Sequence, residues 1–267
     1  MTRFNHAEAI NELQELRTTN ERCSERVVSL AQRIIDDNYT SKLGDQVWPF
    51  YEQAAIAALD TQNFTLANYC IDKLKHRFTE KSLRFRRLLG MRYEAQGLLD
   101  EAQEVYDSIL KEDETNLLAS KRQIALLKAR RKDYELMEAL TAYLDTYYDD
   151  CEAWLELCET YASKYMYEQA AFCCQEMILL QPSNHIFYLK YAEICYTMNQ
   201  YEMALKYYCK VLELCTDHVR ALYGLHLCTT KLQNKQELNL LATERLLDVY
   251  KQKPTLAIVR DYLSVLK

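Results

Sequence analysis

The sequence predicts an all-α fold in which helical hairpins stack into a solenoid, and two observations support this prediction. The 267 residues include only four glycines and three prolines, too few for the turns of a many-stranded sheet or for a glycine-rich phosphate loop. In addition, the pattern that begins at Tyr167 recurs 34 residues later at Tyr201. A fixed period of this size is typical of repeat proteins, whose end units are capped.

Residues 1–42 are expected to form N-terminal capping helices. Apolar residues recur at helical spacing between residues 10 and 16 and again between residues 27 and 34. The first 17 residues lack the apolar core of a signal peptide, and no stretch approaches the roughly 18 apolar residues of a membrane-spanning helix. We therefore expect a cytosolic chain, held elsewhere only by a partner, whose ten cysteines stay reduced.

Repeat units are expected across residues 43–233. Places are counted from the first residue of each 34-residue unit. The unit 151–184 has Trp154, Leu157, Tyr161, Ala170 and Pro182 at places 4, 7, 11, 20 and 32. These are interpreted as packing residues that touch no ligand, because helices approach closely at places 8 and 20 and large side chains fill the gaps between them. The other units are expected at about 48–82, 83–116, 117–150 and 185–218, with the start of another at 219.

This spacing resembles the tetratricopeptide repeat family, which implies a right-handed superhelix of helical hairpins. The unit 117–150 departs from the family pattern, with Leu136 where a small residue belongs and Arg131 where a turn glycine is expected. Residues 234–267 are expected to form two further helices, separated by Pro254, that close the other end of the array.

Catalytic and metal-binding motifs are missing from the sequence. None of the five histidines stands at a metal-ligand spacing, and there is no GxSxG elbow or phosphate-binding loop. Cys158 and Cys174 fall on packing places 8 and 24, so they are interpreted as core residues. We therefore predict no enzyme activity, no cofactor and no metal.

Charge is sorted along the chain, although the net charge is only −6. Eight Lys or Arg face one acid between residues 73 and 92, and six face none between residues 121 and 132. In tetratricopeptide arrays, places 2, 5, 9, 12 and 13 line the concave groove. By that resemblance the partner-binding residues have a basic set in the earlier units, an acidic set in the later units, and one tyrosine: Arg84, Arg87, Lys121 and Lys128; Glu152, Glu159 and Glu193; and Tyr196.

Several longer stretches resemble one family, the tetratricopeptide-repeat subunit (subunit 2) of the endoplasmic reticulum membrane protein complex. They include LGDQVWPFYEQAAIAALD from Leu43, NLLASKRQIALLKA from Asn116 and YEQAAFCCQEMILLQP from Tyr167. The resemblance implies a non-catalytic scaffold, peripheral on the cytoplasmic face of the endoplasmic reticulum. Its implied partners are other subunits of the complex, including cytosolic segments of the membrane-embedded ones, and its implied role is support of tail-anchored and multipass membrane protein insertion.

Two other functions stay open on the residues alone. The first is a free cytosolic adaptor or co-chaperone that binds peptide segments in the concave groove. The second uses the basic windows, with the run KARRK at Lys128 to Lys132, to bind nucleic acid or lipid headgroups. That run lies between two helices of one repeat, which favours a turn whose charges are solvated. Nucleic acid is therefore not an expected partner.

Overall fold

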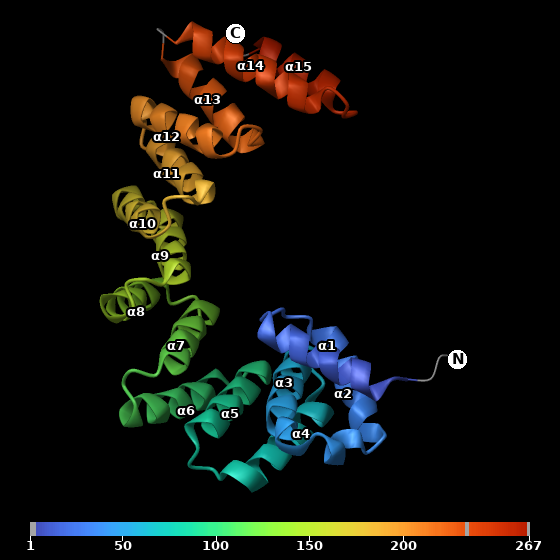
Figure 1. The fold of residues 1–267 in the computed structure, drawn as a ribbon. Coiled ribbons are helices and arrows are strands. Elements are labelled where there is room, and N and C mark those ends of the chain that lie inside the picture. Colours follow the sequence, from blue (N-terminus) through green and yellow to red (C-terminus); the bar gives the residue numbers. More distant parts are fainter. Residues whose placement is uncertain (1–3, 233–234, 266–267) are drawn as a thin grey trace. The chain divides into compact units, whose positions relative to one another are not determined.

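The computed structural model describes residues 4–232 and 235–265, and these residues form α-helices and two short 3-10 helices with no β-strand (Figure 1). They fall into two compact units, residues 1–131 and residues 132–267. The all-α tetratricopeptide-repeat prediction is confirmed. The predicted boundary at residues 233 and 234 lies outside the described residues.

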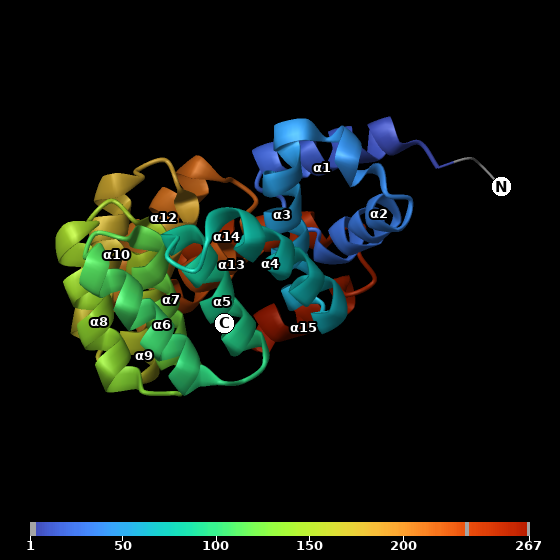
Figure 2. The same ribbon diagram turned by 90° about the horizontal axis from the view of Figure 1, so that it is seen from below.

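The first unit contains seven α-helices in its described part. They are α1 (His6–Thr18), α2 (Ser24–Asp36), α3 (Val47–Asp60), α4 (Phe64–Phe78), α5 (Leu83–Ala95), α6 (Leu99–Glu112) and α7 (Leu117–Ala129), with η1 (Tyr39–Lys42) and η2 (Gly44–Gln46) before α3. Helix α2 packs on α3, as the two views show (Figures 1 and 2). Leu13, Leu30 and Ile34 are buried in one apolar cluster with α3 and α4, so the N-terminal helices cover the first hairpin.

The second unit contains eight α-helices in its described part. They are α8 (Asp133–Thr146), α9 (Cys151–Ser163), α10 (Tyr167–Leu180), α11 (His185–Thr197), α12 (Tyr201–Leu214), α13 (Val219–Lys231), α14 (Gln236–Tyr250) and α15 (Leu256–Val265). At its C-terminal end, Val259 and Leu263 of α15 are buried against Leu222 and Leu246. Helix α15 therefore covers the last hairpin.

The repeat period is visible in the helix boundaries. Helices α5, α7, α9, α11 and α13 each have 13 residues, and the residue before each of the last four caps it with its own side chain. Asn116 accepts a hydrogen bond from the backbone N–H of Ala119 at 3.1 Å, for example. Such caps satisfy backbone donors that have no partner within the helix, and so they fix where each helix begins.

The turn inside each hairpin needs one residue with a left-handed backbone. Gly97 takes it at φ 75°, but Arg131, Tyr165 and Asn199 take it at the matching places with φ between 56° and 61°. Side chains other than glycine pay a steric cost in this region. Arg131, where the sequence lacked the expected glycine, therefore adopts the glycine conformation anyway.

In two hairpins the helices are in close contact at repeat places 8 and 24. Gly90 on α5 faces the ring of Tyr106 on α6, and a Cβ atom at Gly90 would lie 2.6 Å from that ring. In the unit 151–184 the same places hold Cys158 and Cys174, whose sulfur atoms are 3.4 Å apart in the buried core. In the α5–α6 hairpin the tyrosine ring occupies the space that a glycine without a side chain leaves open. In the α9–α10 hairpin, two small cysteine side chains share the space.

Gly90→Ala is expected to destabilise the first unit by about 1–3 kcal/mol, because the added methyl group overlaps the Tyr106 ring. Alanine otherwise favours a helix over glycine by about 1 kcal/mol. In a Tyr106→Leu background the same change should therefore become neutral or stabilising. Urea denaturation of the four proteins measures both effects, and an equal cost in the two backgrounds would contradict the packing explanation.

A buried histidine lies at the contact between α13 and α14. The side chain of His226 is completely buried, and its Nε2 atom has no hydrogen-bond partner among the described residues. Burial lowers the pKa of His226, because the charged imidazolium would lose its hydration. The fold therefore holds this histidine neutral.

Acid should consequently destabilise the second unit through His226. The unfolded chain protonates this histidine near pH 6.5, while the folded chain resists protonation, so stability present above that pH is lost as the pH falls below it. His226→Leu should flatten the fall in thermal stability between about pH 7 and pH 5. His76→Leu, at an exposed histidine, serves as the control. If the thermal stability of the His226→Leu protein falls with pH as steeply as that of the wild type, His226 is not the group responsible.

Candidate partner-binding groove

The first unit contains a groove of about 670 Å³ that brings together three of the predicted basic residues. Arg84 and Arg87 reach it from α5 and Lys121 from α7. Lys128 lies two turns further along α7 and is not among the lining residues. The charged residues that line the groove are six cations and three acids: Arg17, Arg22, Arg84, Arg87, Lys121 and Arg122, with Glu21, Glu52 and Asp60.

Glu52 on α3 holds the two predicted arginines in place. Its carboxylate accepts a hydrogen bond from Arg84 Nε at 2.6 Å and another from Arg87 Nη2 at 2.8 Å. Only 8% of Glu52 is exposed, whereas 54% of the Arg84 side chain faces solvent. One buried carboxylate thus fixes two guanidinium groups on the groove wall. The three charged groups together keep a net positive charge.

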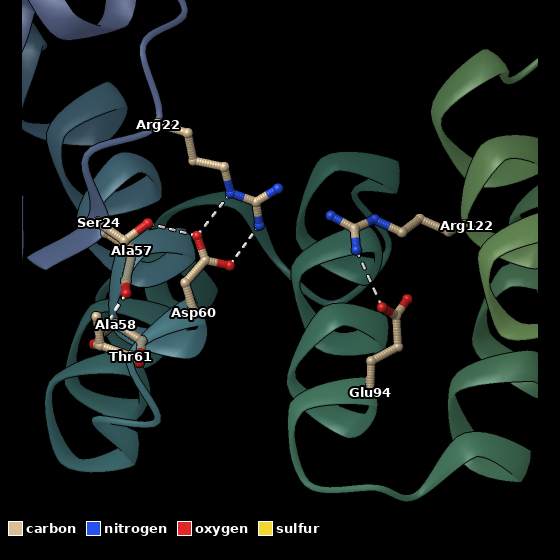
Figure 3. Close-up of polar contacts among 8 residues, drawn as sticks. All are labelled: Arg22, Ser24, Ala57, Ala58, Asp60, Thr61, Glu94 and Arg122. Carbon is tan, nitrogen blue, oxygen red and sulfur yellow. Dashed lines mark hydrogen bonds and ion pairs between the residues drawn. The ribbon is translucent and has the colours of Figure 1, made fainter. Parts of the chain in front are cut away.

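A second pair comes from the N-terminal helices. Arg22 donates to both carboxylate oxygens of Asp60, at 2.9 and 2.5 Å, and Ser24 donates to the same carboxylate at 2.6 Å (Figure 3). The hydrogen bond from Arg22 lowers the pKa of Asp60, helped by Ser24 and by the charge of Arg122, against the opposing effect of burial. Asp60 is the last residue of α3, so this pair ties the α1–α2 loop to the end of the first helix of the α3–α4 hairpin.

A third pair connects the groove to the core. Arg122 on α7 donates to Glu94 on α5 at 3.1 Å, and the hydroxyl of Tyr106 donates to the other oxygen of Glu94 at 2.5 Å. In Figure 3 the guanidinium groups of Arg122 and Arg22 point toward one another across the groove. Burial, followed by the bond to Glu94, raises the pKa of Tyr106 and keeps its hydroxyl protonated. The same tyrosine that packs on Gly90 therefore also positions a charge at the groove.

The predicted acidic residues lie in the second unit, where two of them are paired. Glu159 on α9 accepts from Lys190 on α11 at 2.7 Å, and Glu193 on α11 pairs with Arg220 on α13 at 2.7 Å. Glu152 is exposed near the start of α9. Each pair joins the first helices of consecutive hairpins, so these acids contribute to cohesion as well as to surface charge.

Tyr196 is a partly buried aromatic residue on α11. Its ring packs edge-on against Tyr201 with 5.2 Å between centroids, and burial raises its pKa.

Sequence reasoning missed the partners of the predicted residues. Glu52, Arg22 and Asp60 in the first unit were not singled out, and neither were Lys190 and Arg220 in the second. One signal could have found most of them, since the ion pairs between the first helices of neighbouring hairpins join opposite charges 27 to 35 residues apart. That separation is close to one repeat.

Two absences can be stated for residues 4–232 and 235–265. No group of three or more His, Cys, Asp or Glu side chains there is placed to hold a metal ion. Within the same ranges, every helix is too short or too polar to reach across a lipid bilayer.

Known sequences place the chain in a family. The family model described as the EMC2 TPR-like repeat domain matches residues 79–207. ER membrane protein complex subunit 2 of Xenopus tropicalis is 41% identical over 79% of this chain and 71% of its own length.

This chain belongs to the ER membrane protein complex subunit 2 family.

Another relative of this subunit 2 family member is TPR repeat protein oca3 of Schizosaccharomyces pombe. It is 36% identical over 80% of this chain and 77% of its own length. The matched segment 79–207 contains all eight residues that the sequence predicted for partner binding, but Arg22, Glu52 and Asp60 lie outside it.

Solved structures share the fold. The C-terminal part of a TPR repeat-containing protein from Cytophaga hutchinsonii superposes with a TM-score of 0.65, at 15% identity, over 93% of this chain and 98% of its own. The pilF protein of Pseudomonas aeruginosa gives a TM-score of 0.55 at 17% identity, over 84% of this chain and 99% of its own. At these identities the likeness shows the fold alone.

Asp60→Asn tests the Arg22 pair. The loss of this bidentate ion pair should cost about 1 kcal/mol at neutral pH. The cost should begin to shrink below the ordinary carboxyl pKa of about 3.9, where the unfolded chain becomes protonated, and should disappear only as the pH falls through the lower pKa of Asp60 in the folded protein. Asp100→Asn is the matched control, since that acid is 93% exposed in its pair with Arg130. Urea denaturation at several pH values that shows equal costs for both variants would contradict the prediction.

Proposed function

We propose that this subunit 2 family member is a non-catalytic scaffold, peripheral on the cytoplasmic face of the endoplasmic reticulum, that holds cytosolic segments of membrane-embedded subunits. In this role it supports the insertion of tail-anchored and multipass membrane proteins. The printed names of its relatives support membership of an endoplasmic reticulum membrane protein complex. A repeat array offers an extended concave surface for such work.

The observation that carries the proposal is the cationic groove of the first unit. Six of its nine charged lining residues are basic, and Arg84, Arg87 and Arg22 are held by acids on other helices. Side chains fixed in this way lose less conformational entropy when a ligand binds. The groove is thus prepared for an anionic segment.

An acidic peptide segment fits this arrangement. Guanidinium groups can still donate from their outer N–H groups to a second carboxylate, and Lys121 adds a longer and more adaptable contact. Electrostatic complementarity of this kind chiefly sets the orientation and the rate of association, while apolar contacts from Ile56, Met91 and Leu118 along the groove add affinity.

The test is a pull-down of the tagged full chain from detergent-solubilised endoplasmic reticulum membranes, read by mass spectrometry. Lys121→Glu in the groove should reduce co-purified integral membrane proteins by about tenfold or more, while circular dichroism stays unchanged. A double variant that adds Lys128→Glu, which lies outside the groove on the same helix, tests the remaining predicted lysine. The matched control reverses two exposed lysines outside the groove, Lys81→Glu and Lys111→Glu, and should retain them.

Two outcomes would count against the proposal. If both double variants retain the same amount of integral membrane protein, the groove does not take part in partner binding. A wild-type chain that fractionates without membranes and captures no integral membrane protein would instead fit a free cytosolic adaptor.

A further inference from the structure

A second hollow lies in the second unit, on α8, α9 and α10, and has a volume of about 710 Å³. It contains none of the residues predicted for partner binding. Two residues interpreted as purely packing elements, Trp154 and Tyr161, line it and are only partly buried. Buried Leu157 and Cys173 also line the hollow.

The hollow has a fixed aromatic wall. The indole N–H of Trp154 donates to the carbonyl oxygen of Tyr148 at 2.8 Å, which sets the orientation of the tryptophan. The ring of Phe172 packs edge-on against Trp154 with 6.1 Å between centroids. Nevertheless 54% of Phe172 and 68% of Tyr148 remain exposed. Large apolar side chains gathered in one exposed place are characteristic of interaction surfaces.

The charged residues that line this hollow are all acidic. Asp145 lies on α8, and Glu168 and Glu176 lie on α10, with no Lys or Arg among the lining residues. Within the part of the chain that the structure describes, none of the three forms an ion pair or a side-chain hydrogen bond. They differ in this respect from Glu52 and Asp60 of the first unit, whose charges are already matched.

We propose that the hollow on α8, α9 and α10 docks a basic, apolar segment of a protein partner, distinct from the acidic segment that fits the groove of the first unit. A large apolar side chain of the partner lies against Phe172 and Trp154, while flanking Lys or Arg side chains meet the three carboxylates. Tryptophan and other aromatic residues often contribute most of the binding free energy of a protein interface. A Lys or Arg side chain over the face of an aromatic ring is attracted to it as well. Charge complementarity selects a basic partner over an acidic one.

A synthetic probe tests this inference on the full chain. The probe is a fluorescein-labelled helical peptide of leucine and lysine with leucines on one face, and the counter-probe replaces each lysine by glutamate. Fluorescence anisotropy should show binding of the leucine–lysine peptide that weakens at higher salt. Binding of the leucine–glutamate peptide belongs to the groove of the first unit, so Lys121→Glu should weaken it and Phe172→Ala should leave it unchanged.

Two variants and two matched controls locate the binding. Glu168→Lys and Phe172→Ala should each weaken the leucine–lysine peptide by about tenfold. Glu202→Lys occupies the same repeat place one unit later, and Leu179→Ala removes another exposed apolar side chain of α10. Neither residue lines the hollow, so both controls should leave the dissociation constant within about twofold of wild type.

Three results would overturn the inference. They are the absence of binding by the leucine–lysine peptide, equal weakening by the control variants, and equal weakening of both peptides by Phe172→Ala. Sedimentation velocity adds a fourth, because self-association that Phe172→Ala abolishes would make a second copy of the chain the occupant. The exposed positions of Glu168 and Phe172 keep these variants foldable, and Lys121→Glu with Lys128→Glu, which tests the first groove, should leave this binding unchanged.

Discussion

The groove of the first unit depends on how closely the helices α5 and α6 approach one another. Because Gly90 has no side chain, the ring of Tyr106 packs directly against its backbone. The hydroxyl of Tyr106 donates to Glu94, and Glu94 accepts a second hydrogen bond from Arg122 at the groove. One steric fit therefore sets both the packing of a hairpin and the position of a charge on its surface. A change in the core at this point is felt at the binding surface, because the same tyrosine serves both.

Ion pairs between consecutive hairpins form the second level of organisation. Glu52 with Arg84 and Arg87, and Glu159 with Lys190, join the first helices of neighbouring repeats. Such partly exposed pairs add little stability one at a time. Their larger effect is to restrict long side chains to one orientation, so that a flexible arginine becomes a fixed donor. In the first unit the charged residues that line the groove still include more cations than acids.

Sequence reasoning could reach most of the fold but only part of the candidate sites. Helix starts follow from caps and from the 34-residue period, because packing against identical neighbours forces the same residue types to recur. The pairing of Arg84 with Glu52 depends on side-chain conformations across two helices, and a single repeat place does not reveal it. Trp154 fits the packing pattern and is nevertheless partly exposed at a hollow, which its repeat place does not reveal. The division after Arg131 left no clear mark in the sequence, because the same left-handed turn recurs at Tyr165 and Asn199, where the chain is not divided.

The short reach of the ion pairs bears on how the chain is made. Acid and base in the ion pairs between the first helices of neighbouring hairpins are separated by 27 to 35 residues. At a synthesis rate of roughly 5–20 residues per second, the second member leaves the ribosome only a few seconds after the first. Each new hairpin can thus be added to a folded predecessor while translation continues. The nascent chain then exposes the apolar face of only its most recent hairpin, which limits the time during which a chaperone is needed.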